Sequence, residues 1–243
     1  MLFSFEYLKG KLDIMDMLKK VITNLIYVLD CTLNLVYSDG DKCCICDNYC
    51  EDTSFLCNSC YSKIRFCTEK YYIKEKIREI ECYSMAYYSS VIKEMIVNLK
   101  YKSDFKSGKA LAEMMQGIIY EKNIKFDYIT FVPMTKKYLK IRGYNQSEFL
   151  AQYISRHTDV KMLELLKKNK DSKDQIGLDS DERWYNIRGC FEFIGNKNDI
   201  KEKNILLIDD VITTGATAFY CAEKLINNNA NNVIVLTAAK SKI

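Results

Sequence analysis

The chain has 243 residues, of which 48% are apolar, so it can bury a full core and does not read as a disordered protein. Its formal net charge of +4 permits an anionic ligand but does not require nucleic acid as a partner. Lys, Asn, Ile and Tyr are all abundant, so the lysines alone do not indicate DNA binding. We expect one medium-sized domain with room for a small satellite module.

The first 40 residues carry a helical pattern. Apolar side chains recur at Leu18, Ile22, Leu25 and Leu29, which predicts an amphipathic packing helix. The most apolar stretch, residues 21–36, is too short and too polar to cross a bilayer, and no secretory leader is recognisable. We therefore expect a cytoplasmic protein without a membrane span, whose cysteines stay reduced.

Residues 41–68 hold seven of the eleven cysteines. Two Cys-x-x-Cys pairs, Cys43 with Cys46 and Cys57 with Cys60, have the spacing of a tetrahedral four-thiolate zinc site. Four protein ligands leave no open position, so such a zinc ion would be structural. Cys44 adjoins Cys43 and is an alternative ligand, although it would break the two-residue gap. The competing interpretation is a set of free, buried cysteines.

Beyond residue 80, strand-like and helix-like runs alternate, which favours an α/β sheet flanked by helices. We place the division between an amino-terminal zinc module and this domain at residues 1–70 and 71–243. The polar residues 167–189 are expected to form a loop. Strands are predicted over 82–88, 128–132, 190–194, 205–208 and 233–236, and helices over 91–99, 109–120, 147–155 and 217–226.

The segment 204–217 has the pattern of a phosphate-binding strand, loop and helix. A continuous apolar strand delivers two acids, Asp209 and Asp210, to its carboxyl end, where open α/β sheets bind ligands. The backbone amides of the following loop and the helix end can bind a phosphate. The acids suit two vicinal ribose hydroxyls, directly or through magnesium. The loop residues are Thr213, Thr214, Gly215, Ala216 and Thr217.

The alternative interpretation of this segment is an acidic turn before an ordinary helix, with Thr213 or Thr217 as the helix cap. The adjoining acids followed by Thr-Thr-Gly-Ala-Thr favour the ligand site.

This segment resembles the phosphoribosyl-pyrophosphate motif of type I phosphoribosyltransferases, and the chain as a whole resembles the ComF family of competence proteins. Tyr144 stands where phenylalanine is commoner, and Ser103 stands where glycine is frequent. The other matching residues are Leu99-Lys100-Tyr101, Val132-Pro133, Arg142-Gly143-Tyr144-Asn145-Gln146, Leu150-Ala151, Gln175, Arg183, Asn186 and Phe191.

The resemblance implies a type I phosphoribosyltransferase-like sheet behind a zinc finger, with phosphoribosyl pyrophosphate and magnesium as ligands. Asp209 and Asp210 would be the catalytic acids. The loop after Pro133, together with Lys100 and Arg142, would face the diphosphate, although its lysines could equally be solvated and Lys100 could simply snorkel. That loop also carries Lys136, Lys137 and Lys140.

Four further residues are candidates for the site. Asn145 and Gln146 would cap a helix or touch the ligand, and Gln175 and Arg183 would belong to a closing loop. The single histidine, His157, is expected to be structural.

Two functions remain open from the sequence. The first is a phosphoribosyltransferase-like protein linked to DNA uptake or nucleotide salvage, in which transfer itself is uncertain. The second is a non-catalytic protein of the competence machinery that binds single-stranded DNA or docks a helicase.

Overall fold

The computed structural model describes residues 42–50, 55–67, 69–75, 77–169, 184 and 187–241. The predicted helix over Leu18–Leu29 and the candidates Gln175 and Arg183 lie outside these residues. Within them, no helix is both long and apolar enough to span a membrane.

The centre of the fold is a five-stranded sheet in the order β1-β2-β7-β6-β3. Strands β2, β7, β6 and β3 run parallel, whereas the edge strand β1 is antiparallel to β2. The sheet is therefore mixed but mostly parallel, because the short connection between β1 and β2 reverses the chain. The strands are Tyr71–Glu75 (β1), Arg78–Tyr87 (β2), Tyr128–Phe131 (β3), Asn204–Ile212 (β6) and Asn232–Lys240 (β7).

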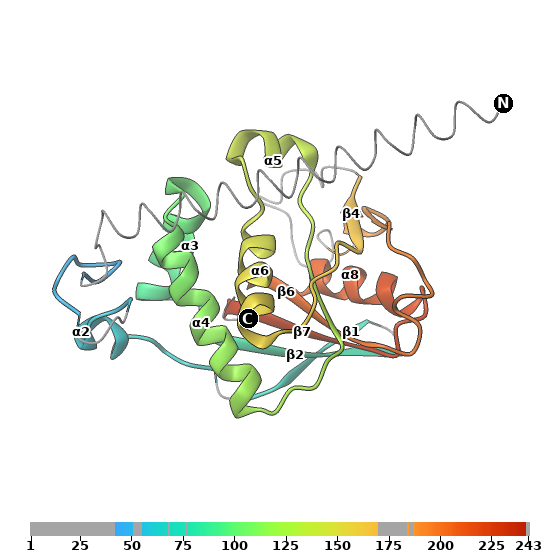
Figure 1. Cartoon of the computed structure of the whole chain (residues 1–243), viewed down its shortest axis with the longest axis horizontal. Coiled ribbons are helices and arrows are strands. Elements are labelled where there is room, and N and C mark those ends of the chain that lie inside the picture. Colours follow the sequence, from blue (N-terminus) through green and yellow to red (C-terminus); the bar gives the residue numbers. More distant parts are fainter. Residues whose placement is uncertain are drawn as a thin grey trace.

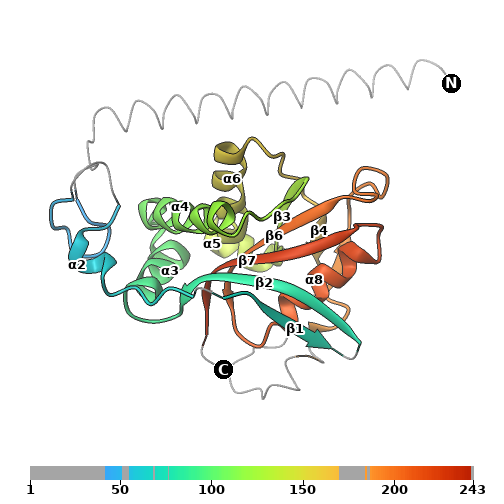
Figure 2. The same cartoon turned by 90° about the horizontal axis from the view of Figure 1, so that it is seen from below.

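Helices cover both faces of this sheet, as Figure 2 shows. Three helices pack on one face and α8 packs on the other. The α/β class with flanking helices, which the resemblance to type I phosphoribosyltransferases implies, is thus confirmed. The helices are Ser90–Lys102 (α3), Phe105–Glu121 (α4), Gln146–Thr158 (α6) and Ala216–Ile226 (α8).

Strand β6 is buried on both faces of the sheet. Ile205 and Leu207 face α8, while Leu206 and Ile208 face α3, α4 and α6, and all four are at most 1% exposed. A strand buried on both faces needs this continuous apolar run instead of an alternating one. The strand therefore lies between two layers of helices, and its carboxyl end leads into the loop before α8.

Short elements decorate the carboxyl edge of the sheet. Helix α5 (Lys136–Arg142) replaces the loop predicted after Pro133, and it stands clear of the body at the top of Figure 1. Strands β4 (Leu166–Lys168) and β5 (Phe191–Phe193) form a separate antiparallel pair. The sequence did not predict β4, because three residues ending in two lysines give no strand period.

The cysteine segment packs against the main domain. It contains the short helix α2 (Asn58–Tyr61), and its apolar residues Leu56 and Ile64 share a core with α3 and α4. Lys106 on α4 also donates to the backbone oxygen of Lys42 at 2.6 Å. The division of the chain at residue 70 stays a prediction.

Candidate functional site

Several backbone amides of the loop between β6 and α8 have no backbone acceptor among the described residues. Gly215 precedes α8 in the left-handed region, with φ at 86°, and this conformation turns the chain into the helix. In the described part of the chain, the amides of Thr213, Thr214, Gly215 and Thr217 have no backbone acceptor. Neither threonine that we considered as a cap bonds to the helix end. The loop therefore presents donors to a cavity of about 330 Å³.

Asp209 is held at the floor of this cavity. It is 8% exposed, and its Oδ1 accepts from the hydroxyl of Ser147 at 2.8 Å and from the amide of Asp210 at 2.9 Å. Burial, reinforced by the negative charge of Asp210, raises the pKa of Asp209 to about 7, although the Ser147 hydroxyl and Lys100 act in the opposite direction. Asp209 thus titrates near neutral pH.

Asp210 forms an ion pair with Lys100 of α3. The two side chains are 6% and 22% exposed respectively. Burial disfavours the ammonium of Lys100, but the charge and hydrogen bond of Asp210 outweigh it and raise the pKa of Lys100. Lys100, which we predicted on the diphosphate side, lies beside the acids and lines the loop cavity, and its place relative to a diphosphate stays a prediction.

Three cavities adjoin one another along the carboxyl edge of the sheet. The loop cavity shares Asp209 and Thr217 with a second cavity of about 250 Å³, which lies beside Pro133 and Arg142. That cavity shares Thr135 and Lys168 with a third, of about 500 Å³. A ligand could extend from the loop across Pro133.

The second cavity contains most of the predicted diphosphate side. Arg142 donates to Gln146 and lies over the ring of Tyr101, 5.4 Å from its centroid. The sequence predicts that Asn145 either caps a helix or touches the ligand. Its side chain caps α6 by accepting from the Ser147 amide at 3.0 Å, and the residue also lines the second cavity.

Lys136 and Lys137 line the third cavity and not the second. Lys167 and Lys168 of β4 line the same third cavity. Lys140 lines none of the three cavities.

Sequence reasoning missed several residues of the site. Ser147 orients Asp209, Lys168 joins two cavities, and Thr135 has a hydroxyl that is buried without a partner in the described residues. Only Ser147 carried a signal, because it directly follows the Asn145-Gln146 motif. His157 lies at the far end of α6, stacked on Tyr153, and takes no part in these cavities.

The acid pair is a poor match to a magnesium ion held by these carboxylates alone. Asp209 uses Oδ1 for its protein contacts and lines the loop cavity, whereas Asp210 is held by Lys100 through Oδ2. Magnesium needs a nearly octahedral shell of oxygens. Here the ammonium of Lys100 already balances Asp210, so the protein does not supply the charge that would draw a divalent ion to this pair.

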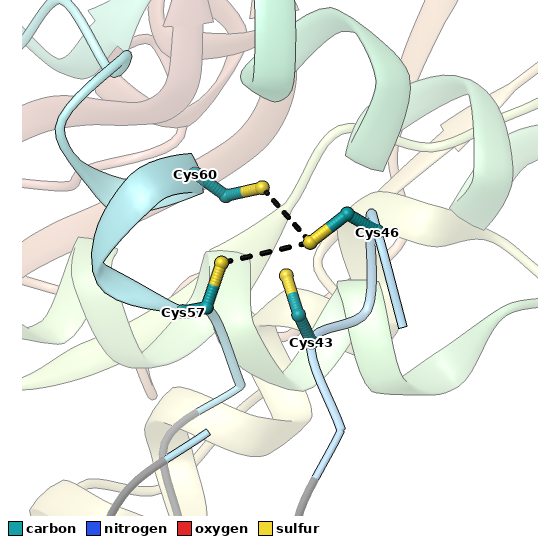
Figure 3. A group of neighbouring side chains, drawn as sticks. All are labelled: Cys43, Cys46, Cys57 and Cys60. Carbon is teal, nitrogen blue, oxygen red and sulfur yellow. Dashed lines mark hydrogen bonds between the residues drawn. The ribbon is translucent and has the colours of Figure 1, made fainter. Parts of the chain in front are cut away.

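The four predicted zinc ligands converge, as Figure 3 shows. The sulfurs of Cys43, Cys46, Cys57 and Cys60 all lie within 4.8 Å of one another, and Cys46 Sγ is 3.6 Å from both Cys57 Sγ and Cys60 Sγ. Zinc–sulfur bonds near 2.3 Å in a tetrahedron would separate the sulfurs by roughly 3.8 Å. The cluster could therefore bind a metal ion such as zinc.

The environment of the sulfurs supports the choice of Cys43 over Cys44. Although burial opposes ionisation, the amides of Cys57, Cys46 and Ile45 lower the pKa of Cys43 to about 6. The thiol of Cys44 bonds instead to Ser107, outside the cluster, and burial raises its pKa to about 12.

The raised pKa of Asp209 predicts a pH effect on stability. Its folded value of about 7 exceeds the usual unfolded value near 3.9, so its contribution is complete below about pH 4 and is lost as the pH rises to 7. The free energy of unfolding of the wild type should therefore fall between pH 5 and pH 8 relative to that of Asp209→Asn. Urea unfolding at pH 5 and pH 8 measures the free energy of unfolding of the wild type minus that of the variant. If this quantity stays constant or rises with pH, the raised pKa of Asp209 is contradicted.

The chain is similar in sequence to curated competence and DNA-utilization proteins, although no protein-family profile matches it. It is 25% identical to competence protein F of Haemophilus influenzae over 197 residues, which are 78% of this chain and 86% of that protein. It is 29% identical to DNA utilization protein YhgH of Escherichia coli K12 over 110 residues, 45% of this chain and 47% of that protein. It is 26% identical to competence protein ComFC of Bacillus subtilis over 145 residues, 57% and 55% of the two chains.

Among solved structures, the chain overlaps with adenine phosphoribosyltransferase of Thermoanaerobacter pseudethanolicus at a TM-score of 0.39 and 11% identity, over 75% of this chain and 98% of that one. It overlaps with glutamine phosphoribosylpyrophosphate amidotransferase of B. subtilis at a TM-score of 0.37 and 20% identity, over 54% and 26% of the two chains. With its α/β sheet and its four-cysteine cluster, the chain is a homologue of the ComF and YhgH proteins.

Proposed function

We propose that the chain binds a 5-phosphoribosyl ligand, foremost phosphoribosyl pyrophosphate, at the loop Thr213–Thr217. The observation that carries this proposal is the row of amides without backbone acceptors at the mouth of β6, next to two buried acids. The amides and the amino end of α8 would bind the 5-phosphate. Asp209 and Asp210 would accept hydrogen bonds from the ribose hydroxyls.

The second cavity would hold the diphosphate. Arg142 offers a forked donor to it, and Lys168 supplies a further positive charge. Magnesium would enter as the counter-ion of the diphosphate. In a transfer reaction the bond from C1 of the ribose to the diphosphate oxygen would break, the diphosphate would keep the electron pair, and the acceptor would bond to C1. Such a step depends on charge stabilisation and positioning more than on a histidine base.

The names of the relatives favour a role in DNA uptake or DNA use. Competence protein F and DNA utilization protein YhgH carry these functions in their names. We infer that this chain serves a related process, either as a transferase in nucleotide salvage or as a sensor of phosphoribosyl compounds. Its zinc module would be structural.

Substitution of Gly215 tests the proposed function. A Cβ at this position would lie 2.9 Å from Ile73 Cγ2, and φ is 86°, so Gly215→Ala should distort the loop. We expect ribose 5-phosphate and phosphoribosyl pyrophosphate to bind the wild type and to lose at least about tenfold in affinity in the variant, as measured by calorimetry.

Gly117→Ala is the matched control. Gly117 is an exposed glycine within α4, and a Cβ there would meet nothing within 4 Å. This variant should bind like the wild type and gain up to about 1 kcal/mol in stability. If the wild type binds neither compound with magnesium present, the proposal is wrong. Release of diphosphate from phosphoribosyl pyrophosphate with a panel of bases would separate a transferase from a sensor.

A second candidate function is binding of single-stranded nucleic acid, and the third cavity favours it. Four lysines, Lys136, Lys137, Lys167 and Lys168, line this cavity, and Glu192 is the one acid among its described lining residues. Tyr138 on α5 is 42% exposed. Lysines can bind successive phosphates while an aromatic ring stacks on a base. Affinity for a single-stranded oligonucleotide that falls steeply with salt, without any response to ribose 5-phosphate, would favour this function over the first.

A further inference from the structure

The ammonium of Lys100 lies beside Asp209 and Asp210, the two neighbouring acids of β6, and pairs with Asp210. Lys100 extends from the carboxyl end of α3, and its ammonium contacts Oδ2 of Asp210 while lining the same cavity as the Thr213–Gly215 loop. Its side chain is 22% exposed, so the ammonium is largely withdrawn from solvent. A lysine that only extended its charge into water would not be held against a buried carboxylate in this way.

The other groups around the pair belong to the protein as well. Asp209 is fixed by the Ser147 hydroxyl of α6 and by its own chain, and the charge of Arg142 on α5 also acts on Lys100. The attraction of Asp210 outweighs burial and raises the pKa of Lys100, so its ammonium stays charged at neutral pH. One negative charge of the acid pair is thus balanced before any ligand arrives.

We propose that Lys100 is the resident cation of the acid pair, so that the site binds the ribose hydroxyls of a phosphorylated pentose without a divalent metal. The proposal rests on the function proposed above and specifies it. Magnesium then acts only on the diphosphate, and ligands that lack a diphosphate bind independently of metal. Lys100 is a positioning residue, because it acts on the sugar through Asp210.

Ribose 5-phosphate is the probe, because it carries the 5-phosphate and the sugar hydroxyls but no diphosphate. Calorimetry on the full-length protein, loaded with its structural metal, is carried out with excess magnesium and again without it. A weak chelator that spares the cysteine cluster removes the magnesium. We expect the dissociation constants of the wild type to agree within about twofold, whereas phosphoribosyl pyrophosphate should bind more tightly with magnesium.

Lys100→Met removes the ammonium but keeps most of the side-chain volume. Without magnesium its affinity for ribose 5-phosphate should fall at least about tenfold, and magnesium should restore part of the loss because Asp210 is then free to attract a cation. Lys100→Arg keeps the charge and should remain independent of metal. Lys102→Met, an exposed position two residues further along the same helix, is the matched control and should bind like the wild type.

A wild type that needs magnesium for ribose 5-phosphate overturns this inference and leaves the proposed function intact. A wild type that binds no phosphorylated pentose under either condition overturns both. Should Lys100→Met not fold, Lys100→Gln takes its place, and the wild-type comparison with and without magnesium still decides the question. Equal affinity of Lys100→Met, or of Lys100→Gln in its place, and the wild type without magnesium also overturns the inference.

Discussion

Replacing Asp210 by alanine should lower the free energy of unfolding by about 3 kcal/mol, the low end of the range for breaking a buried ion pair. The variant leaves the ammonium of Lys100, which is 22% exposed, without the carboxylate that compensates its desolvation. Partial access to the cavity water keeps the loss from being larger. Urea unfolding at pH 7.5 measures the change.

The double variant Lys100→Met with Asp210→Ala distinguishes the ion pair from other effects of Asp210. Removing both charges should recover most of the stability that the single variant loses, because no uncompensated charge remains buried. It should not recover binding of ribose 5-phosphate, since the hydroxyl acceptor is still absent.

Glu79→Ala provides the reference for an exposed ion pair. Glu79 lies 2.8 Å from Lys74, and both side chains are more than half exposed. Its loss should cost less than about 1 kcal/mol. If Asp210→Ala costs no more than Glu79→Ala, the Lys100–Asp210 pair is not the buried pair described above.

Loss of the cysteine site should have the second large effect. We expect about one zinc ion per chain by elemental analysis, and Cys60→Ser should remove most of it, because a four-thiolate site loses its closed shell with one ligand. The melting temperature should fall, since Cys43, Leu56 and Cys60 belong to the same core as α3 and α4. Hydrogen exchange should increase first in residues 55–67.

Cys44→Ser is the control for this prediction. Cys44 adjoins the cluster but turns its thiol toward Ser107, so this variant should keep its zinc. Ribose 5-phosphate should still bind after chelation, because the loop cavity lies on β6 and α8, away from the cysteines. A wild type without zinc, or Cys60→Ser with a full complement of zinc, would contradict the structural role of the cluster.

Local patterns in the sequence predicted much of the fold. The apolar run before Asp209 indicated a strand buried on both faces, and β6 is that strand. The spacing of the cysteine pairs indicated one four-sulfur cluster, and the structure assembles it. These predictions succeeded because hydrophobic period and ligand spacing are properties of neighbouring residues, and such properties survive in any tertiary context.

Other predictions depended on contacts between distant segments, and these were wrong or absent. The loop predicted after Pro133 is the helix α5, and the edge strand β1 runs antiparallel to its neighbour. Thr135 and Lys168 meet at one cavity although more than thirty residues separate them in the chain. The hydrophobic pattern of neighbouring residues cannot predict such a contact between distant segments.

Residue patterns alone were enough to predict the cysteine cluster, the alternation of strands and helices, and the loop that follows the two acids. The pairing of Lys100 with Asp210 and the contact of Ser147 with Asp209 became visible only in the folded structure. The physical reason is that a residue pattern indicates which side chains are buried, whereas the partner of a buried charge depends on how helices dock across the end of the sheet.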